Sequence, residues 1–247
     1  MDFFKSILLS ALLAGVIAGT ALTGLQALKV YPLIFAAEVF EDAGQAESNP
    51  VASSHSHEQG NQLASGHKHG DEGEEWAPAD GGERLLFSLL ANVLIGVALG
   101  LVLAAIFALR HVADWRQGVV WGVGGFIAVN LAPAFGLPPE LPGMPAGELL
   151  ARQTWWLATA LLTACGIAAV FLSRGMIWRV GGVVLIALPH FIGAPHPATL
   201  ESGVPANLAA DFATASLATN LVFWAILGIL TAEIMARLAR PSEPELA

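Results

Sequence analysis

Charged residues and cysteines are both scarce in this chain. Of its 247 residues only 13% are charged, whereas 55% are hydrophobic. Soluble domains usually carry about a quarter charged residues, so the composition excludes an ordinary soluble domain and indicates a protein that lies in a lipid bilayer. The single cysteine, Cys165, excludes a disulfide framework and any metal site built from several cysteines.

Signature motifs of several enzyme classes are also absent from the sequence. It contains no Gly-x-x-x-x-Gly-Lys-Ser/Thr loop for phosphate, no His-Glu-x-x-His zinc motif and no serine nucleophile elbow. The net charge of -9 argues against a nucleic-acid partner. We therefore expect a protein that is not an enzyme, holds no permanent cofactor and binds no nucleic acid.

The sequence instead contains several long runs of uncharged residues. A helix needs about 20 apolar residues to cross a hydrocarbon core of about 30 Å. Five runs have this length: 7–28, 85–109, 118–139, 153–173 and 212–232. The first could also be a secretory signal peptide, but it is longer than the usual apolar core and lacks an Ala-x-Ala site.

A sixth run, from Val180 to about Ala194, is shorter and contains His190, so it is either a complete span begun near Met176 or a re-entrant element. With six spans, seven Lys and Arg side chains lie on the side of the N-terminus and three on the other, whereas five spans give five on each side. Cytoplasmic segments carry the excess of basic residues. We therefore predict an all-α polytopic bundle of about six transmembrane helices with both termini cytoplasmic.

The acidic residues are concentrated in one stretch. Eleven of the 20 Asp and Glu residues fall between Glu38 and Glu83. Within it, residues 44–75 carry too little apolar surface to offset the entropy of folding. We predict one membrane domain over residues 1–247 and a flexible, external His- and acid-rich insert at residues 44–75, between the first and second helices.

Two His-x-His motifs give this insert the chemistry of a metal site. Side chains two residues apart point to the same side of an extended chain, so each pair can present both imidazoles to one ion. Bringing the pairs together costs on the order of 2 kcal/mol, which nitrogen–metal bonds exceed. Binding should fade below about pH 6, because imidazole must be neutral to bind metal. The four candidate ligands are His55, His57, His67 and His69.

Imidazole and carboxylate ligands suit Co, Ni, Cu and Zn, so the insert indicates a divalent transition metal without choosing one. The alternative is a polar spacer whose histidines bind nothing. Glu38 and Glu41 lie one turn apart beyond Pro32, which should bend the first helix. They could relay a cation from the insert, or they could be an acidic helix end that faces water.

Polar side chains inside the predicted spans supply further candidates. Amides such as Asn130 and Gln153 most often form interhelical hydrogen bonds. His190 differs because prolines on both sides break its helix, and broken backbone at membrane depth lines cavities. We predict His190 as a metal ligand, against the alternative of a buried structural histidine, and Asn130, Gln153 and His196 as residues along the path of the ion.

The stretch from Pro133 to Pro145 carries five prolines, so it cannot continue as a helix. It should form an ordered turn outside the membrane or a re-entrant one. On the outer side it could act as a lid or as a docking face.

Several residue strings resemble the CbtA family, and the resemblance extends from Ala37 to the last helix. The strings are Trp76–Gly81, Leu131–Gly143, Ala151–Trp156 and Leu188–Pro195. Members are predicted cobalt transporter subunits, so the resemblance implies an inner-membrane protein for cobalt uptake linked to cobalamin supply. It also implies a small one-span partner, CbtB, whose terminus carries histidines.

The resemblance matches Glu38, Glu41, Arg152, Gln153 and His190 but assigns none of them as a ligand. Phe40 stands where many relatives have Tyr, which leaves both carboxylates in place. We predict a membrane permease subunit for uptake of a divalent transition metal, with cobalt favoured. The alternative is a metal-sensing or metal-export membrane protein for nickel, zinc or copper.

Overall fold

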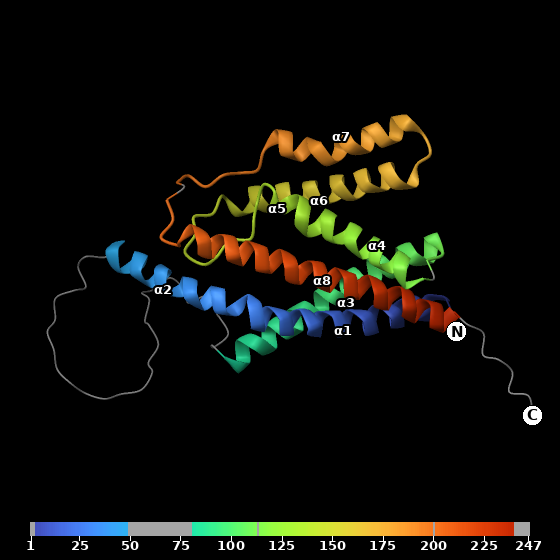
Figure 1. The fold of residues 1–247 in the computed structure, drawn as a ribbon, viewed down its shortest axis with the longest axis horizontal. Coiled ribbons are helices and arrows are strands. Elements are labelled where there is room, and N and C mark those ends of the chain that lie inside the picture. The colour runs from blue at the N-terminus through green and yellow to red at the C-terminus, as the bar shows by residue number, and fades with distance from the viewer. Residues whose placement is uncertain (1–2, 49–80, 113, 200, 240–247) are drawn as a thin grey trace, which may run out of the picture.

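The computed structural model describes residues 3–48, 81–112, 114–199 and 201–239, and every regular element in these ranges is a helix. The all-α prediction is thereby confirmed. The helices run along one common direction (Figure 1). They are α1 (Phe3–Lys29), α2 (Tyr31–Ser48), α3 (Gly82–Arg110), α4 (Trp115–Phe126), the π-helix η1 (Ile127–Leu131), α5 (Ala132–Ala134), α6 (Leu149–Leu172), α7 (Met176–Ile192) and α8 (Ala206–Ala239).

Five helices of the described chain are long and apolar enough to cross a membrane, with α4, η1 and α5 counted as one. The sixth expected span corresponds to α7, which has 17 residues and a length of about 26 Å. Figure 1 shows that α7 runs back along α6 and returns the chain to the end where α8 begins. The start of α1 and the end of α8 therefore lie at the same end of the bundle.

The predicted boundaries differ most from the helices in the third and the last span. The third span ends at Ala134 and not at Pro139, because Pro138 and Pro139 cannot donate the backbone hydrogen bonds of a further turn. The last helix begins at Ala206, six residues before the predicted start, and ends at Ala239, seven residues after the predicted end. In both cases the error lies outside the apolar core, where hydropathy carries little information about helix ends.

The expected bend near Pro32 is confirmed as a break of one residue. Helix α1 ends at Lys29 and α2 begins at Tyr31. Pro32 has no N–H for the carbonyl one turn back, and the carbonyl of Val30 instead accepts from the N–H groups of Leu33 and Ile34 at 3.1 and 3.2 Å. The break separates α1 from α2, which still packs against α8.

Glycines bring pairs of helices into backbone contact. A Cβ atom on Gly96 of α3 would lie 2.5 Å from the carbonyl oxygen of Gly15 of α1, so neither side can carry a larger residue without separating the helices. Gly166 of α6 and Gly182 of α7 meet in the same way, at 2.6 Å. Small residues one turn apart allow this approach in lipid, where packing replaces the hydrophobic effect.

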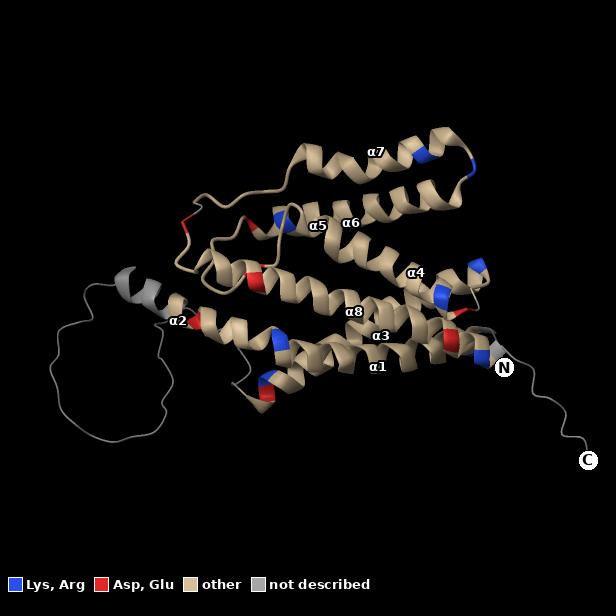
Figure 2. Ribbon diagram, viewed as in Figure 1, with Lys and Arg blue, Asp and Glu red and all other residues tan. Residues whose placement is uncertain are grey.

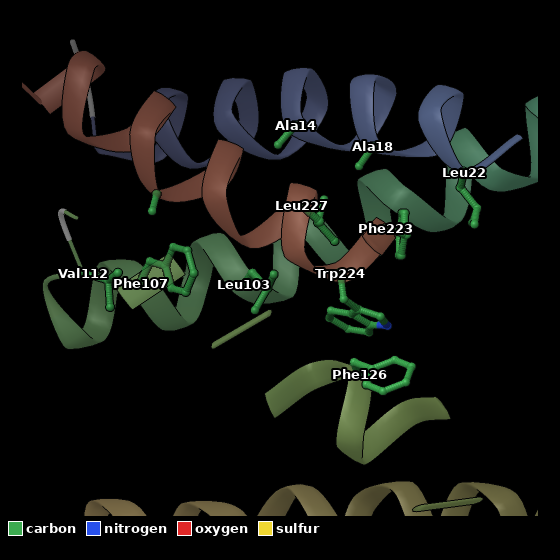
Figure 3. Packing of buried hydrophobic residues seen from close by; sticks show 11 residues of the cluster. Ala14, Ala18, Leu22, Leu103, Phe107, Val112, Phe126, Phe223, Trp224 and Leu227 are labelled. Carbon is green, nitrogen blue, oxygen red and sulfur yellow. The ribbon is translucent and has the colours of Figure 1, made fainter. Parts of the chain in front are cut away.

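The largest core cluster joins α1, α3, α4 and α8. Phe107 of α3 and Leu227 of α8 are almost fully buried in it. Figure 3 shows Trp224 of α8 directed toward Phe126 of α4, across the centre of the cluster. Helix α7 packs mainly on α6, and this hairpin contacts the rest of the bundle mostly through η1 and α5. A seam therefore separates the α6–α7 hairpin from the larger unit.

The proline-rich stretch forms an ordered connection from 135 to 148, as expected. Its Leu141 is only 3% exposed and packs with Val30, Ala37, Val204 and Phe212. These partners come from the α1–α2 junction, from α2, from the segment just before α8 and from the second turn of α8. The connection therefore closes over one end of the bundle.

The two ends of the bundle differ in their charged residues (Figure 2). One end, which we call the basic end, holds six of the nine Lys and Arg residues described: Lys5, Arg110, Arg116, Arg174, Arg179 and Arg237. The other, the acidic end, holds Lys29, Arg84 and Arg152 together with Glu38, Glu83, Glu140, Glu148, Glu201 and Asp211. The helical segments between the two ends are uncharged, as a hydrocarbon environment requires.

Candidate metal pathway

A cavity of about 650 Å³ lies in the seam between the α6–α7 hairpin and the η1–α5 segment. Its wall includes residues just beyond the helix ends at the acidic end, such as Gly136 and His196. It also includes Thr163, which lies just past the midpoint of α6. The cavity therefore extends from the acidic end to the middle of the membrane-spanning segments. Its other lining residues are Ile127, Leu131, Ala132, Phe135, Trp155, Ile186, His190, Gly193 and Ala194.

His190 stands in the last turn of α7 and lines this cavity together with His196. Its imidazole makes edge contacts with the rings of Trp155 and Phe135, with centroids 6.0 and 6.2 Å away. Gly193 ends the helix with a φ of 87°, a conformation that a side chain would strain. Pro189 does not break the helix as expected, because α7 continues through it to Ile192. The turn after Gly193 is what lets two histidines six positions apart line one cavity.

Two helix ends add a negative potential at the mouth of the cavity. The segment from α4 to α5 stops at Ala134, and α7 stops at Ile192, so both C-terminal ends lie beside lining residues. The unpaired carbonyls of a helix C-terminus carry a partial negative charge, worth about 0.3–1 kcal/mol to a nearby cation. The mouth is therefore suited to a cation even though no carboxylate lines it.

The two amides predicted to lie on the path are not brought to this cavity. Asn130 of η1 accepts a hydrogen bond from the indole N–H of Trp224 at 2.7 Å, so it faces α8. Gln153 is exposed on α6 and is not part of the lining. Both roles stay predictions. For Asn130 the geometry supports the alternative of an interhelical hydrogen bond, which is the usual role of an amide in a membrane helix.

Three residues of the wall were not among the predicted site residues. Phe135, Trp155 and Thr163 face the cavity. For two of them a signal existed, because Trp155 and Thr163 lie eight positions apart on α6 and therefore on one face. Nothing in the sequence indicates that this face meets η1 and α7.

Glu38 is engaged in an ion pair that ties α2 to α3. Its Oε1 accepts from Nη1 of Arg84 at 3.0 Å, and the guanidinium also lies over the ring of Phe35. Glu41 belongs to α2, but its side chain lies outside the described part of the structure. The insert histidines His55, His57, His67 and His69 also lie outside the described residues.

A second ion pair fixes the connection 135–148 above the cavity. Arg152 of α6 donates to Glu140 at 2.5 Å, and both side chains are mostly buried. Glu148 caps the first turn of α6 by accepting from the N–H groups of Leu150 and Ala151. These contacts hold the loop against the start of the helix whose next turns line the cavity.

Within the described ranges, no three His, Cys, Asp or Glu side chains converge at a distance suited to one metal ion. His190 and His196 can therefore contribute at most two nitrogens, and a bound ion would complete its shell with water, carbonyl oxygens or side chains from elsewhere. Such an incomplete shell fits a path along which ions move more closely than it fits a storage site.

Comparison with known families decides the class of the protein. The sequence model of one family, described as "Probable cobalt transporter subunit (CbtA)", matches residues 4–236. The chain belongs to the CbtA family. No curated protein and no solved structure matches the chain.

Membership of the CbtA family confirms the expected membrane transport class and implies a transport role and not an enzymatic one. The description of the family suggests cobalt as the substrate, and its word "subunit" implies a partner chain. The matched region covers all helices that border the cavity, so the cavity belongs to the part of the chain that defines the family.

Proposed function

We propose that this CbtA-family protein takes up Co²⁺ and that the ion enters through the cavity lined by His190 and His196. One observation carries the proposal: the cavity opens beside two helix C-termini at the acidic end and reaches the middle of α6. Imidazole nitrogens bind Co²⁺, and a negative potential raises its local concentration.

The orientation follows from the distribution of basic residues. Cytoplasmic ends of membrane proteins carry the excess of Lys and Arg, so we place the basic end in the cytoplasm of a bacterial cell and both termini with it. Helix α2 ends, and α3 begins, at the acidic end, so the insert is attached outside. Uptake then runs from the acidic end to the basic end.

On the proposed route the ion first binds to the insert. His55, His57, His67 and His69 would capture the ion outside, and Glu38 and Glu41 would receive it. Because Glu38 is paired with Arg84, its carboxylate can receive a cation only by exchanging that partner. The ion would then pass to His190 and His196. Asn130 would act indirectly, because its bond to Trp224 joins η1, which lines the cavity, to α8.

The membrane potential is a sufficient driving force for this route. Two charges that cross 100 mV gain about 4.6 kcal/mol, enough for accumulation on the order of 2,000-fold. The chain itself has no phosphate-binding loop. We propose that a small one-span CbtB-like subunit completes the transporter.

Accumulation of radiolabelled cobalt in cells tests the proposal. His190→Ala and His196→Ala should each lower uptake at low cobalt. His111→Asn is the matched control, because His111 lies at the basic end of α3 in a left-handed conformation that Asn tolerates. Normal uptake by a variant that lacks both cavity histidines would exclude this route. Competition by nickel, zinc and copper tests the metal, and transport in liposomes separates a permease from a sensor or an exporter.

A further inference from the structure

Helix α6 carries a line of buried polar atoms that have no hydrogen-bond partner among the described residues. They are the indole nitrogen of Trp155 and the hydroxyls of Thr159 and Thr163. The three residues are spaced by four, so they lie on one face of the helix. Both threonine side chains are fully buried, with no accessible surface. We call this line the α6 polar stripe.

Three other hydroxyls of the bundle bond to a carbonyl of their own helix, whereas those of Tyr31 and Thr231 are also buried without a partner. Ser10 donates to the carbonyl of Ser6 at 2.6 Å, Thr23 to that of Gly19 at 3.0 Å, and Thr219 to that of Ala215 at 3.0 Å. Thr159 and Thr163 lack such a bond. Buried polar groups are almost always hydrogen-bonded to protein or ordered water, so the α6 polar stripe calls for partners that are not protein atoms.

The stripe borders the histidine cavity. Trp155 and Thr163 both line it, and Thr159 lies between them on the same face of α6. Across the cavity stands η1, a π-helix in which the N–H of Ala132 bonds to the carbonyl of Ile127. Pro133 removes the next backbone donor from this turn. Such wide turns occur mostly at functional sites, and here Ile127 and Leu131 of η1 line the same cavity as Thr163.

We propose that the α6 polar stripe becomes the wall of a water-filled path from the two histidines toward the middle of the membrane when the α6–α7 hairpin moves away from the larger unit along the seam. In this structure Thr159 and Thr163 have no accessible surface, so water reaches them only after that movement. Water can donate to and accept from both hydroxyls and can accept from the indole N–H. The stripe contains no carboxylate or imidazole, so it binds a divalent cation only through water and releases it readily. For the identity of the ion, and only for that, this inference rests on the proposed function.

Cysteine labelling of the full chain tests for water in this path. Cys165 is the only cysteine, so Cys165→Ser provides a background without thiols. Thr159→Cys and Thr163→Cys are then compared with Leu157→Cys and Leu161→Cys, which lie on the opposite face of α6 and are 52% and 58% exposed toward lipid. A cationic methanethiosulfonate reagent reacts with thiolates, which form only in water.

We expect the threonine positions to react at least tenfold faster than the leucine positions at the same depth. Equal or slower reaction would mean that the stripe is dry and would overturn the inference. Protection by Co²⁺ is a separate readout: fast labelling without it keeps the water path and counts against cobalt as the ion that passes.

Removal of a single hydroxyl gives a second test that does not depend on labelling. Thr163→Val keeps the shape of the side chain. If the hydroxyl contacts water on the ion path, uptake should fall severalfold while the melting temperature changes little. Thr231→Val is the control, because Thr231 is also buried without a partner but stands alone on α8, away from the cavity. A rise in melting temperature with unchanged uptake for Thr163→Val would show a dry hydroxyl and refute the proposal.

Discussion

The contact between α6 and α7 gives the sharpest prediction about stability, because two adjacent glycines of α7 differ in their surroundings. A Cβ on Gly182 would lie 2.6 Å from the carbonyl oxygen of Gly166, whereas a Cβ on Gly181 would meet no atom within 4 Å. Both sites are inside a helix, so alanine should bring each a similar gain of up to about 1 kcal/mol from helix propensity. The gain cancels when the two variants are compared.

The difference in free energy of unfolding between the two variants is then the cost of pushing α6 and α7 apart. Overpacking a close contact typically costs about 1–3 kcal/mol. Helix α7 packs mainly on α6, so little else can compensate for the lost contact. We therefore expect Gly182→Ala to be less stable than Gly181→Ala by about 1–3 kcal/mol, with Gly181→Ala at or above the parent.

Thermal or denaturant unfolding of the purified chain in detergent measures this difference, and cobalt uptake in cells shows whether the cavity survives. Because His190 stands on α7 and Thr163 on α6, displacement of the hairpin should also lower uptake. Equal stabilities for the two alanine variants would refute the reasoning, since it would mean that the close contact does not hold the hairpin together.

Two further predictions concern the acidic end. Glu140→Gln and Arg152→Met should each destabilise the chain. A double-mutant cycle should give a coupling free energy of about 1–2 kcal/mol, above that of an exposed pair, because both side chains are mostly buried. A coupling below about 0.3 kcal/mol in thermal unfolding would contradict the role of this pair in fixing the loop. Replacement of all four insert histidines by Gln should raise the cobalt concentration for half-maximal uptake and leave the maximal rate intact, and an unchanged uptake curve would mean that the insert does not capture the metal. The four are His55, His57, His67 and His69.

In the proposed route, the acidic end would select the ion and the interior of the cavity would let it pass. At the acidic end, imidazoles, carboxylates and helix C-termini can attract and recognise a divalent cation. Deeper in, the described wall of the cavity offers hydroxyls, an indole and apolar side chains. A path that recognises its ion at the mouth and holds it weakly inside lets the ion leave as well as enter.

The chain's hydropathy was enough to predict the long helices, because only a helix satisfies every backbone group within a hydrocarbon core. Local chemistry predicted the break beside Pro32, since the missing N–H acts within one turn. The short helix α7 was the ambiguous element, and the path of the folded chain shows how it connects α6 to α8. The ends of the third and last spans were missed, because helix ends depend on loops whose packing hydropathy does not describe.

The same distinction between local and tertiary information applies to the candidate site. Composition and motif determined by themselves that this is a membrane protein with two histidines close to prolines, since ligand chemistry and the length of a span are local properties of the chain. The break expected beside Pro189 was wrong, because α7 continues to Ile192. Only the tertiary structure decided that His190 and His196 share a cavity, that Asn130 holds Trp224 and that Glu38 is paired with Arg84. The physical reason is the rotation of each helix about its own axis. Glycine contacts and core side chains of the neighbouring helices set this rotation. The rotation in turn decides whether a polar side chain meets a cavity, another helix or lipid.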